Sequence, residues 1–245
     1  MELGKSTGLT LLLVKPAPPP YTNSLASSKT SPQKASCNYT RVVRELGPIE
    51  ETFVVDHSIR VNEEFLPSLT DEQRKAEGGR NNLYLKAKYG DVNVDIHIEK
   101  DSPTAPSKKP VDTRFPDRVK LMAESGKGDV LMRLHAPSRE NRRPLHLSIN
   151  AHSGSIFVLL PRSITGTVNV TANKQPVVVT GDLSKITNII SEDGKARKLI
   201  IGDLKGPWKQ VEKDEIVLSA SRRVYLQYVD EKFEKPDVEG GCIVA

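Results

Sequence analysis

The feature that most constrains the fold is a strand–turn–strand pattern that recurs through the body of the sequence. In the first copy, apolar residues occupy alternate positions over 83–87 and again over 92–96, and Gly90 lies between the two runs. Alternation with a period of two predicts a β-strand with one buried face, and a glycine between two such runs predicts a turn. Each copy is therefore expected to form a strand–turn–strand unit.

The same template recurs four more times, with inserts of varying length between the copies. One unit cannot bury its apolar face alone, so the units are expected to stack around a shared core. The stretches 186–190 and 198–201 predict a further strand pair around Glu192–Gly194. The apolar positions of the later copies are Leu121, Ala123, Val130, Met132 and Leu134; Leu147, Ile149, Ala151, Ile156, Val158 and Leu160; Val168, Val170, Ala172, Val177 and Val179; and, more loosely, Ile216, Leu218, Ala220, Val224, Leu226 and Tyr228.

This repeat predicts an all-β fold, in which strand–turn–strand units form a short β-solenoid; a β-sandwich of stacked hairpins is the alternative. The solenoid is favoured because the same apolar face recurs in register in every unit. Aromatic residues make up only 5% of the chain, which agrees with a core of small aliphatic side chains. The sequence lacks the Cys…Trp…Cys spacing of an immunoglobulin domain.

Composition divides the chain into three parts. Residues 1–46 are rich in Pro, Ser, Thr and Lys and are expected to form a disordered arm, because they cannot bury enough apolar surface to fold. Residues 47–230 are expected to form the β-repeat domain, and 231–245 a flexible tail. The net charge of +5 comes partly from the arm. Without a dense basic face or a known module, it does not predict nucleic-acid binding.

The last four residues, Cys242, Ile243, Val244 and Ala245, match the Cys–aliphatic–aliphatic–X pattern of prenylated proteins. Ala at the last position favours a farnesyl group. The motif predicts modification of Cys242 by a protein prenyltransferase and a peripheral location at the cytoplasmic face of a membrane. A single lipid chain binds a bilayer weakly, so a second signal is expected. The basic arm, palmitoylation of Cys37 or oligomerisation are candidates.

A proline–tyrosine stretch in the arm, Pro18, Pro19, Pro20 and Tyr21, has the form that WW-type modules bind as a polyproline helix. The alternative is a stiff linker. If the stretch is used, the chain could be a soluble interaction protein whose arm recruits an unknown protein partner.

The sequence predicts no catalytic residue, no metal site and no cofactor. Asp91 and Asp129 each follow a turn glycine, and Asp95 lies on the outward face of the same copy as Asp91. Aligned carboxylates can serve acid–base chemistry, so a carbohydrate-active enzyme on a β-helix is the alternative function. However, Gly-Asp is an ordinary turn dipeptide, and we interpret both aspartates as turn residues. The five histidines lack the spacing of a zinc site.

Three sets of segments resemble a fungal family of domains of unknown function: 47–56; 82–85 with 89–92; and 151–156 with 160–163. The turns of that family are similar to those of adhesin-like β-repeat proteins, whose copies share a small–polar–Gly–x–hydrophobic motif. The resemblance covers about residues 47–230 and implies a β-repeat fold without catalytic residues. Glycine is missing at 174–176 and at Arg222–Arg223, where opened or bulged turns are expected.

These observations together predict a non-enzymatic β-repeat protein. We expect it to be farnesylated at Cys242, held at the cytoplasmic face of a membrane, and to present a binding surface to a protein partner.

Overall fold

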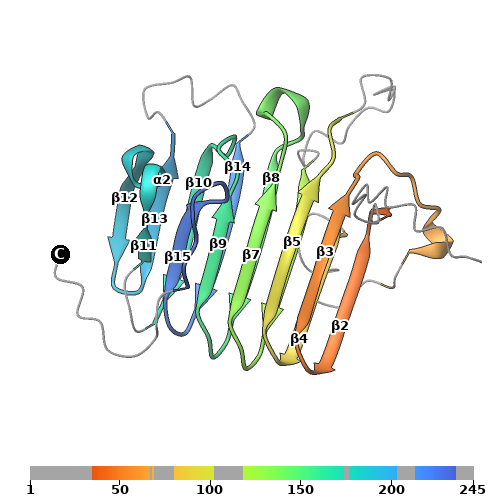
Figure 1. Ribbon diagram of the computed structural model, residues 1–245, viewed down its shortest axis with the longest axis horizontal. Helices are drawn as coiled ribbons and strands as arrows, with labels where there is room; N and C mark the ends of the chain where they lie inside the picture. Colours follow the sequence, from red (N-terminus) through yellow and green to blue (C-terminus); the bar gives the residue numbers. More distant parts are fainter. Residues whose placement is uncertain are drawn as a thin grey trace, which may run out of the picture. The chain divides into compact units, whose positions relative to one another are not determined.

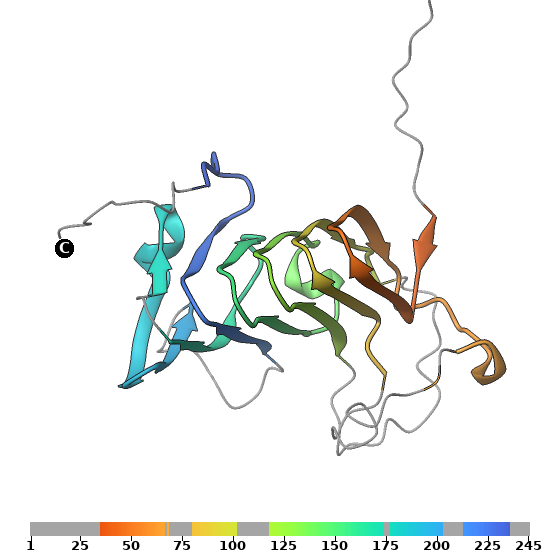
Figure 2. The ribbon, with the colours of Figure 1, turned by 90° about the horizontal axis from the view of Figure 1, so that it is seen from below.

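The chain forms two β-sheets that face each other across a shared core (Figure 1, Figure 2). The structure is a computed structural model that describes residues 35–66, 68, 80–101, 118–173, 177–202 and 213–235. In this part, the seven-stranded sheet has the order β1 (Ser36–Cys37), β3 (Ile49–Val55), β5 (Val92–Ile98), β7 (Val130–His135), β9 (Ile156–Leu160), β15 (Val224–Tyr228) and β11 (Val177–Val179). The eight-stranded sheet has the order β12 (Thr187–Asp193), β13 (Ala196–Ile201), β10 (Gly166–Ala172), β14 (Asp214–Ala220), β8 (Leu145–Ala151), β6 (Val119–Ser125), β4 (Leu83–Tyr89) and β2 (Thr40–Leu46). The helices within the described ranges are short: η1 (Glu63–Phe65), η2 (Arg139–Asn141) and α2 (Gly181–Ile186).

Each unit gives one strand to each sheet, and the turn between its strands crosses from one sheet to the other. Corresponding strands of neighbouring units pair in parallel: β4 with β6 and β6 with β8 in one sheet, and β5 with β7 and β7 with β9 in the other. The register joins equivalent positions of the predicted copies, since Leu121 is the partner of both Leu83 and Leu147. The repeat in the sequence is therefore also a repeat in space.

The core lies between the sheets and consists of the alternating apolar residues of each strand. In β8, Leu147, Ile149 and Ala151 are buried, while the residues between them are half-buried. The same alternation holds in β5 and β14. Removing a Val, Leu or Ile side chain from water contributes about 1.5–3 kcal/mol, so stacking the units stabilises the fold. The described residues form mostly β-strands in two sheets, and the predicted β fold is confirmed to that extent.

The spatial order of the units differs from their order in the chain. The last unit, β14–β15, lies between the unit β8–β9 and the pair β10–β11. Leu218 of β14 has Ile149 as its partner on one side and Val170 on the other. Beyond β10, β13 pairs antiparallel with β10, and β12 pairs antiparallel with β13. The chain thus leaves a gap after the unit β8–β9 and fills it with its last two strands, β14 and β15.

Strands β1 and β2 and the helix α2 differ from what the sequence predicts. Strands β1 and β2 lie inside the range 1–46 that was assigned to the arm, because β2 pairs in parallel with β4 over Thr40–Leu46. The short helix α2 was not predicted, and it precedes the edge strand β12. Among the described residues, no helix is long and apolar enough to cross a bilayer.

The turn at Arg222–Arg223, which lacks glycine, is shorter than the turn of the unit β8–β9 and is not bulged. The residues Ser221–Arg223 replace the longer turn His152–Ser155 of the preceding unit, and the strands on both sides keep their register, with Ala220 opposite Ala151. Arg222 N donates a backbone hydrogen bond to Gly154 O, and Ile156 N donates one to Arg223 O. These bonds hold the turn against the turn 152–155 of the neighbouring unit. The other expected irregular turn, 174–176, lies outside the described residues.

Candidate functional site

The turns that connect the two strands of each unit lie along one edge of the domain, at the bottom of Figure 1. We call this the turn edge and define it by the turns of five units together with the strand ends that flank them. These turns are 47–48, 90–91, 126–129, 152–155 and 221–223. Because the units stack in parallel, each turn lies directly against the next.

Glycines allow these turns to approach closely. A Cβ atom added to Gly90 would lie 2.3 Å from the carbonyl oxygen of Gly47, and one added to Gly154 would lie 2.1 Å from the carbonyl oxygen of Gly128. Real Cβ atoms do not approach backbone oxygens so closely, so only glycine fits where one backbone passes against another. The turn glycines of the repeat are thus required by stacking between units.

The two turn aspartates, Asp91 and Asp129, occupy equivalent places, as the sequence predicts. Oδ1 of Asp91 accepts a hydrogen bond from the backbone N–H of Asp129 at 2.8 Å, and Oδ1 of Asp129 accepts one from the backbone N–H of Ser155 at 2.8 Å. Each carboxylate therefore holds the next turn in place. This arrangement agrees with their interpretation as turn residues.

Cations and two exposed apolar side chains share the same edge. Leu46 and Tyr89 end neighbouring strands and are register partners, with 78% and 43% of their surfaces exposed. The ammonium groups of Lys88 and Lys127 lie 5.5 Å and 4.9 Å from the centre of the Tyr89 ring. Such distances are typical of cation–π contacts.

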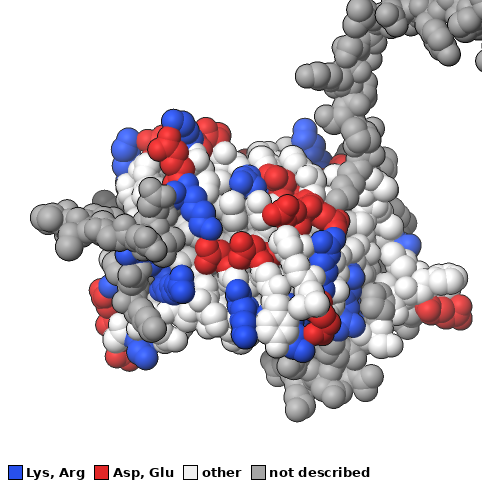
Figure 3. Space-filling model, turned by 60° about the horizontal axis from the view of Figure 1, so that its bottom comes forward, with Lys and Arg blue, Asp and Glu red and all other residues white. Residues whose placement is uncertain are grey.

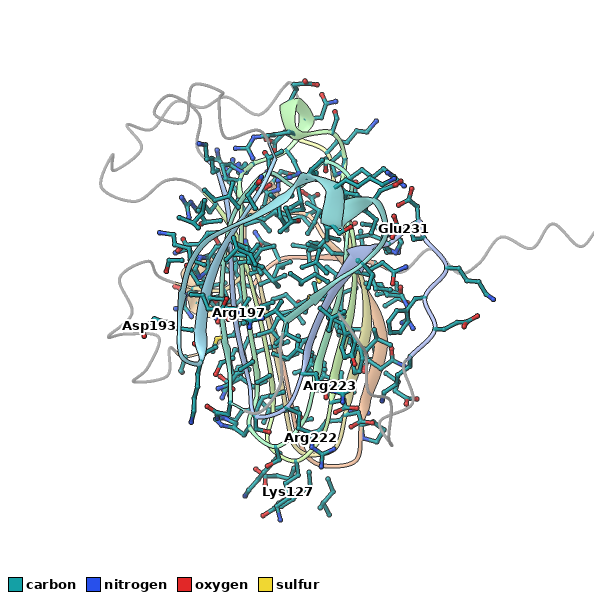
Figure 4. The ribbon with its side chains drawn as sticks, turned by 90° about the vertical axis from the view of Figure 1, so that its left-hand side faces the viewer. Lys127, Asp193, Arg197, Arg222, Arg223 and Glu231 are labelled. Carbon is teal, nitrogen blue, oxygen red and sulfur yellow. The ribbon has the colours of Figure 1, made fainter. Side chains whose placement is uncertain are left out.

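Two arginines extend this group along the edge. Arg222 is exposed, and Arg223 donates a hydrogen bond from Nη1 to the hydroxyl oxygen of Tyr225 at 3.2 Å. Figure 4 places Lys127, Arg222 and Arg223 at the turn end of the domain, whereas Asp193, Arg197 and Glu231 lie farther from it. Figure 3 shows that basic and acidic side chains are interspersed on this side and form no continuous basic face.

After β15, residues 229–235 cross the outer face of β9, and we call them the C-terminal strap. The backbone N–H of Val229 donates to Leu160 O at 2.9 Å, and Nε of Arg162 donates to Asp230 Oδ2 at 2.6 Å. Glu231 Oε1 accepts the backbone N–H of Asp182 at 2.8 Å. These bonds fix the beginning of the strap beside α2.

The end of the strap lies on apolar side chains and reaches the turn edge. Phe233 packs edge-on against Phe157, with ring centroids 5.8 Å apart. Phe157 and Leu159 point away from the core, yet both are buried. Nζ of Lys235 lies 2.8 Å from Asp129 Oδ2. Residues 231–235, which were assigned to the flexible tail, are therefore part of the folded domain.

At the opposite edge, Asp214 forms a buried ion pair with Arg142. Arg142 Nη1 and Nη2 donate to the two carboxylate oxygens of Asp214 at 2.8 Å each. The same carboxylate accepts the backbone N–H groups of Leu145 and Thr165. Because its partners come from two separate connections, the one before β8 and the one before β10, Asp214 ties the first residue of β14 to the units on both sides. The cluster has a structural role.

The outer face of the seven-stranded sheet carries a histidine pair. The rings of His97 and His135 stack with centroids 4.3 Å apart. Asp95 lies 3.6 Å from the His135 ring and 3.6 Å from Arg133. Burial lowers the pKa of His97 below its usual value of 6.5, and the neighbouring His135 lowers it further, whereas Asp95 opposes the shift. Both rings point away from the core, as predicted.

The lipidation motif Cys242–Ala245 and the proline–tyrosine stretch Pro18–Tyr21 lie outside the described residues, so these predictions stay untested. Within the described part of the chain, no cluster of three or more His, Cys, Asp or Glu side chains is placed to hold a metal ion.

Sequence reasoning did not identify the surface formed by Leu46, Tyr89 and Lys127. Its residues come from three different units, so no pattern within one unit marks it.

The chain matches no curated protein and no solved structure. A family model described as a domain of unknown function, DUF7330, matches residues 38–231, which include β2 and the first residues of the strap. The predicted resemblance to a family of domains of unknown function is thereby confirmed, while fungal origin and adhesin-like repeats stay predictions. The chain therefore belongs to the DUF7330 family of domains of unknown function.

Proposed function

We propose that this chain is a non-enzymatic β-repeat protein, farnesylated at Cys242 and held at the cytoplasmic face of a membrane, where it presents a binding surface. The observation that carries the proposal is the terminal Cys–Ile–Val–Ala motif, which follows the Gly240–Gly241 spacer. Prenyltransferases act in the cytosol, so the motif, if used, also assigns the compartment.

The strap supports this proposal. It holds Lys235 beside Asp129, and Cys242 lies seven residues farther along the chain. Seven extended residues span at most about 25 Å. A lipid on Cys242 would therefore hold the domain close to a bilayer.

For the domain itself we propose the β-solenoid rather than the sandwich of stacked hairpins. The support is the pairing pattern: the two strands of a unit lie in different sheets, and each pairs in parallel with the equivalent strand of the next unit. Stacked hairpins would instead pair the two strands of each unit with one another, in antiparallel fashion.

The proposal of a non-enzymatic role rests on what the turn carboxylates contact. Asp91 and Asp129 accept backbone hydrogen bonds from the next turn, and Asp129 also holds Lys235. A pair of catalytic carboxylates would have to be free to exchange protons with a bound sugar. If the alternative, a carbohydrate-active enzyme, were correct, Asp91→Asn with Asp129→Asn would abolish activity toward polysaccharides while leaving the fold intact.

Expression of the full chain in a eukaryotic host, followed by intact mass spectrometry, tests the proposed function. We expect loss of Ile243–Ala245 together with the gain of a farnesyl group and a methyl ester, and recovery of the protein in the membrane fraction. The Cys242→Ser variant should keep its full mass and remain in the soluble fraction. Cys37→Ser is the matched control and should behave like the wild type. An unmodified wild-type mass would refute the proposal.

A further inference from the structure

We propose that the turn edge is a second membrane contact, which binds the headgroups of anionic phospholipids while its two exposed apolar side chains enter the interface of the bilayer. This inference rests on the proposed anchoring and deepens it. It names the second signal that a singly lipidated protein needs and assigns it to residues of the folded domain.

The first support is the chemistry of the protruding side chains. Leu46 and Tyr89 lie side by side at the ends of β2 and β4 and expose 78% and 43% of their surfaces. Two lysines contact the tyrosine ring, with Nζ of Lys127 at 4.9 Å and Nζ of Lys88 at 5.5 Å from its centre. Aromatic rings beside aliphatic tips, with lysines at the level of the phosphates, are typical of proteins that bind at a bilayer interface.

The second support is the charge that remains at this edge after its ion pairs are considered. Glu45 lies 2.9 Å from Lys88 and offsets it, and Asp129 is offset by Lys235. Asp91 accepts a hydrogen bond from a backbone N–H of the next turn and keeps its negative charge, which offsets one further cation. Because Lys127, Arg222 and Arg223 lie at the same edge, the edge still carries a net positive charge.

The cations that remain are Lys127, Arg222 and Arg223. The guanidinium groups suit lipid phosphates in particular, because a planar fork can donate two parallel hydrogen bonds to one phosphate group. Arg222 is exposed and, in the described part of the chain, has no ion-pair partner. Three such cations near an anionic surface are expected to strengthen binding roughly a hundredfold.

The third support is the place where the tail begins. The last repeat lies inside the stack rather than at its end, and the strap then returns the chain to Asp129, in the third of the five turns. The tail that carries Cys242 therefore starts from the same edge as the cations. A lipid within about 25 Å of Lys235 would hold this edge within reach of the bilayer.

The proposal is tested by vesicle sedimentation of the farnesylated full chain. Binding is compared between vesicles of phosphatidylcholine alone and vesicles that also contain phosphatidylserine. We expect phosphatidylserine to increase the affinity of the wild type. In Lys127→Gln/Arg222→Gln/Arg223→Gln this increase should fall roughly a hundredfold, while binding to phosphatidylcholine alone should be unchanged.

A matched variant removes the same number of charges elsewhere. Arg60, Lys100 and Lys198 are exposed and lie outside the turn edge, and Arg60→Gln/Lys100→Gln/Lys198→Gln should keep most of the effect of phosphatidylserine. Equal losses in the two triple variants would mean that net charge alone drives binding and would overturn the proposal. An unchanged affinity of the turn-edge variant for phosphatidylserine vesicles would also overturn the proposal. The turn edge would then be assigned to a protein partner instead.

The Cys242→Ser chain separates this inference from the proposed function. Its binding to phosphatidylserine vesicles at low ionic strength should be weak but should still depend on Lys127, Arg222 and Arg223. Failure of farnesylation is seen in the mass spectrum and leaves this comparison intact. If the unlipidated chain and its turn-edge variant bind these vesicles equally, the edge is not a lipid-binding surface.

Discussion

Arg142 and Asp214 are 72 residues apart in the sequence and form a two-pronged ion pair with both side chains almost fully buried. The pair joins the connection before β8 to the first residue of β14. It therefore fixes the last repeat of the chain in the gap between earlier repeats.

Replacing Asp214 by alanine is expected to destabilise the domain by about 3–5 kcal/mol, because Arg142 would be left as a buried charge without its partner. The loss is measured by urea unfolding. The neighbouring Glu215 is the matched control: its ion pair with Arg118 is partly exposed, and Glu215→Gln should cost less than about 1 kcal/mol. Similar losses in the two variants would contradict a special role for the buried pair.

Gly154→Ala is expected to destabilise the fold by about 1–3 kcal/mol, since the new Cβ would lie 2.1 Å from the carbonyl oxygen of Gly128 and would push two turns apart. Thermal unfolding measures the change. At Gly194 a Cβ would meet no atom within 4 Å, and the backbone there is left-handed. Gly194→Asn should therefore be tolerated, because asparagine accepts that conformation. Wild-type stability of Gly154→Ala would show that the turns are not tightly stacked.

Phe233→Ala is expected to lower the free energy of unfolding by about 1–3 kcal/mol, because it removes the ring that covers Phe157. Chemical unfolding gives the magnitude, and faster proteolysis within the strap would show that it has come loose. Phe65, which is 79% exposed, is a control of the same residue type, and Phe65→Ala should change stability by less than about 0.5 kcal/mol. Equal stability of Phe233→Ala and the wild type would mean that the strap is not part of the domain.

The histidine pair predicts a pH dependence of stability. Burial lowers the pKa of His97 in the folded state, so the unfolded chain binds more protons between this lowered pKa and the usual value of 6.5. The free energy of unfolding should consequently fall as the pH falls through that window. His97→Gln should remove this part of the fall, whereas His152→Gln, at the exposed turn edge, should not. Unfolding curves at a series of pH values check the difference, and identical profiles for His97→Gln and the wild type would exclude it.

The strands that face the core could be predicted from the sequence because burial on one side imposes alternation. The first apolar positions of the copies form one continuous row across the eight-stranded sheet, from Leu83 through Leu121, Leu147 and Ile216 to Val168. The periodicity that defines a strand here also sets its register, because a shift by one residue would turn the apolar face outward.

Strand β2 could not be predicted in this way, because it lies at the edge of its sheet and most of its side chains are exposed. Charged residues such as Arg41 and Arg44 interrupt the alternation. The spatial order of the units could not be predicted from the sequence either. All copies present the same apolar face, so nothing in Leu218 favours pairing with Ile149 over pairing with another strand.

The turn-edge surface is likewise a product of stacking. Leu46, Tyr89 and Lys127 belong to three different units and meet only because the turns lie against one another. The strap was missed for a different reason. Its one aromatic contact, Phe233 on Phe157, lies in a charged segment, and one aromatic residue carries no periodic signal.

The interposed last repeat also constrains the order in which this protein can be built on the ribosome. The units up to β8–β9 can assemble as they emerge, because the unit that each one packs against precedes it in the chain. Strand β10 can pair with β13, but it cannot join the stack of earlier units, because its neighbour β14 is translated later. Strands β10, β13 and β12 therefore reach their place only after β14 and β15 have been made. Until then the nascent chain carries an open edge at β8 and β9, and a stop before β14 would leave that edge exposed to aggregation.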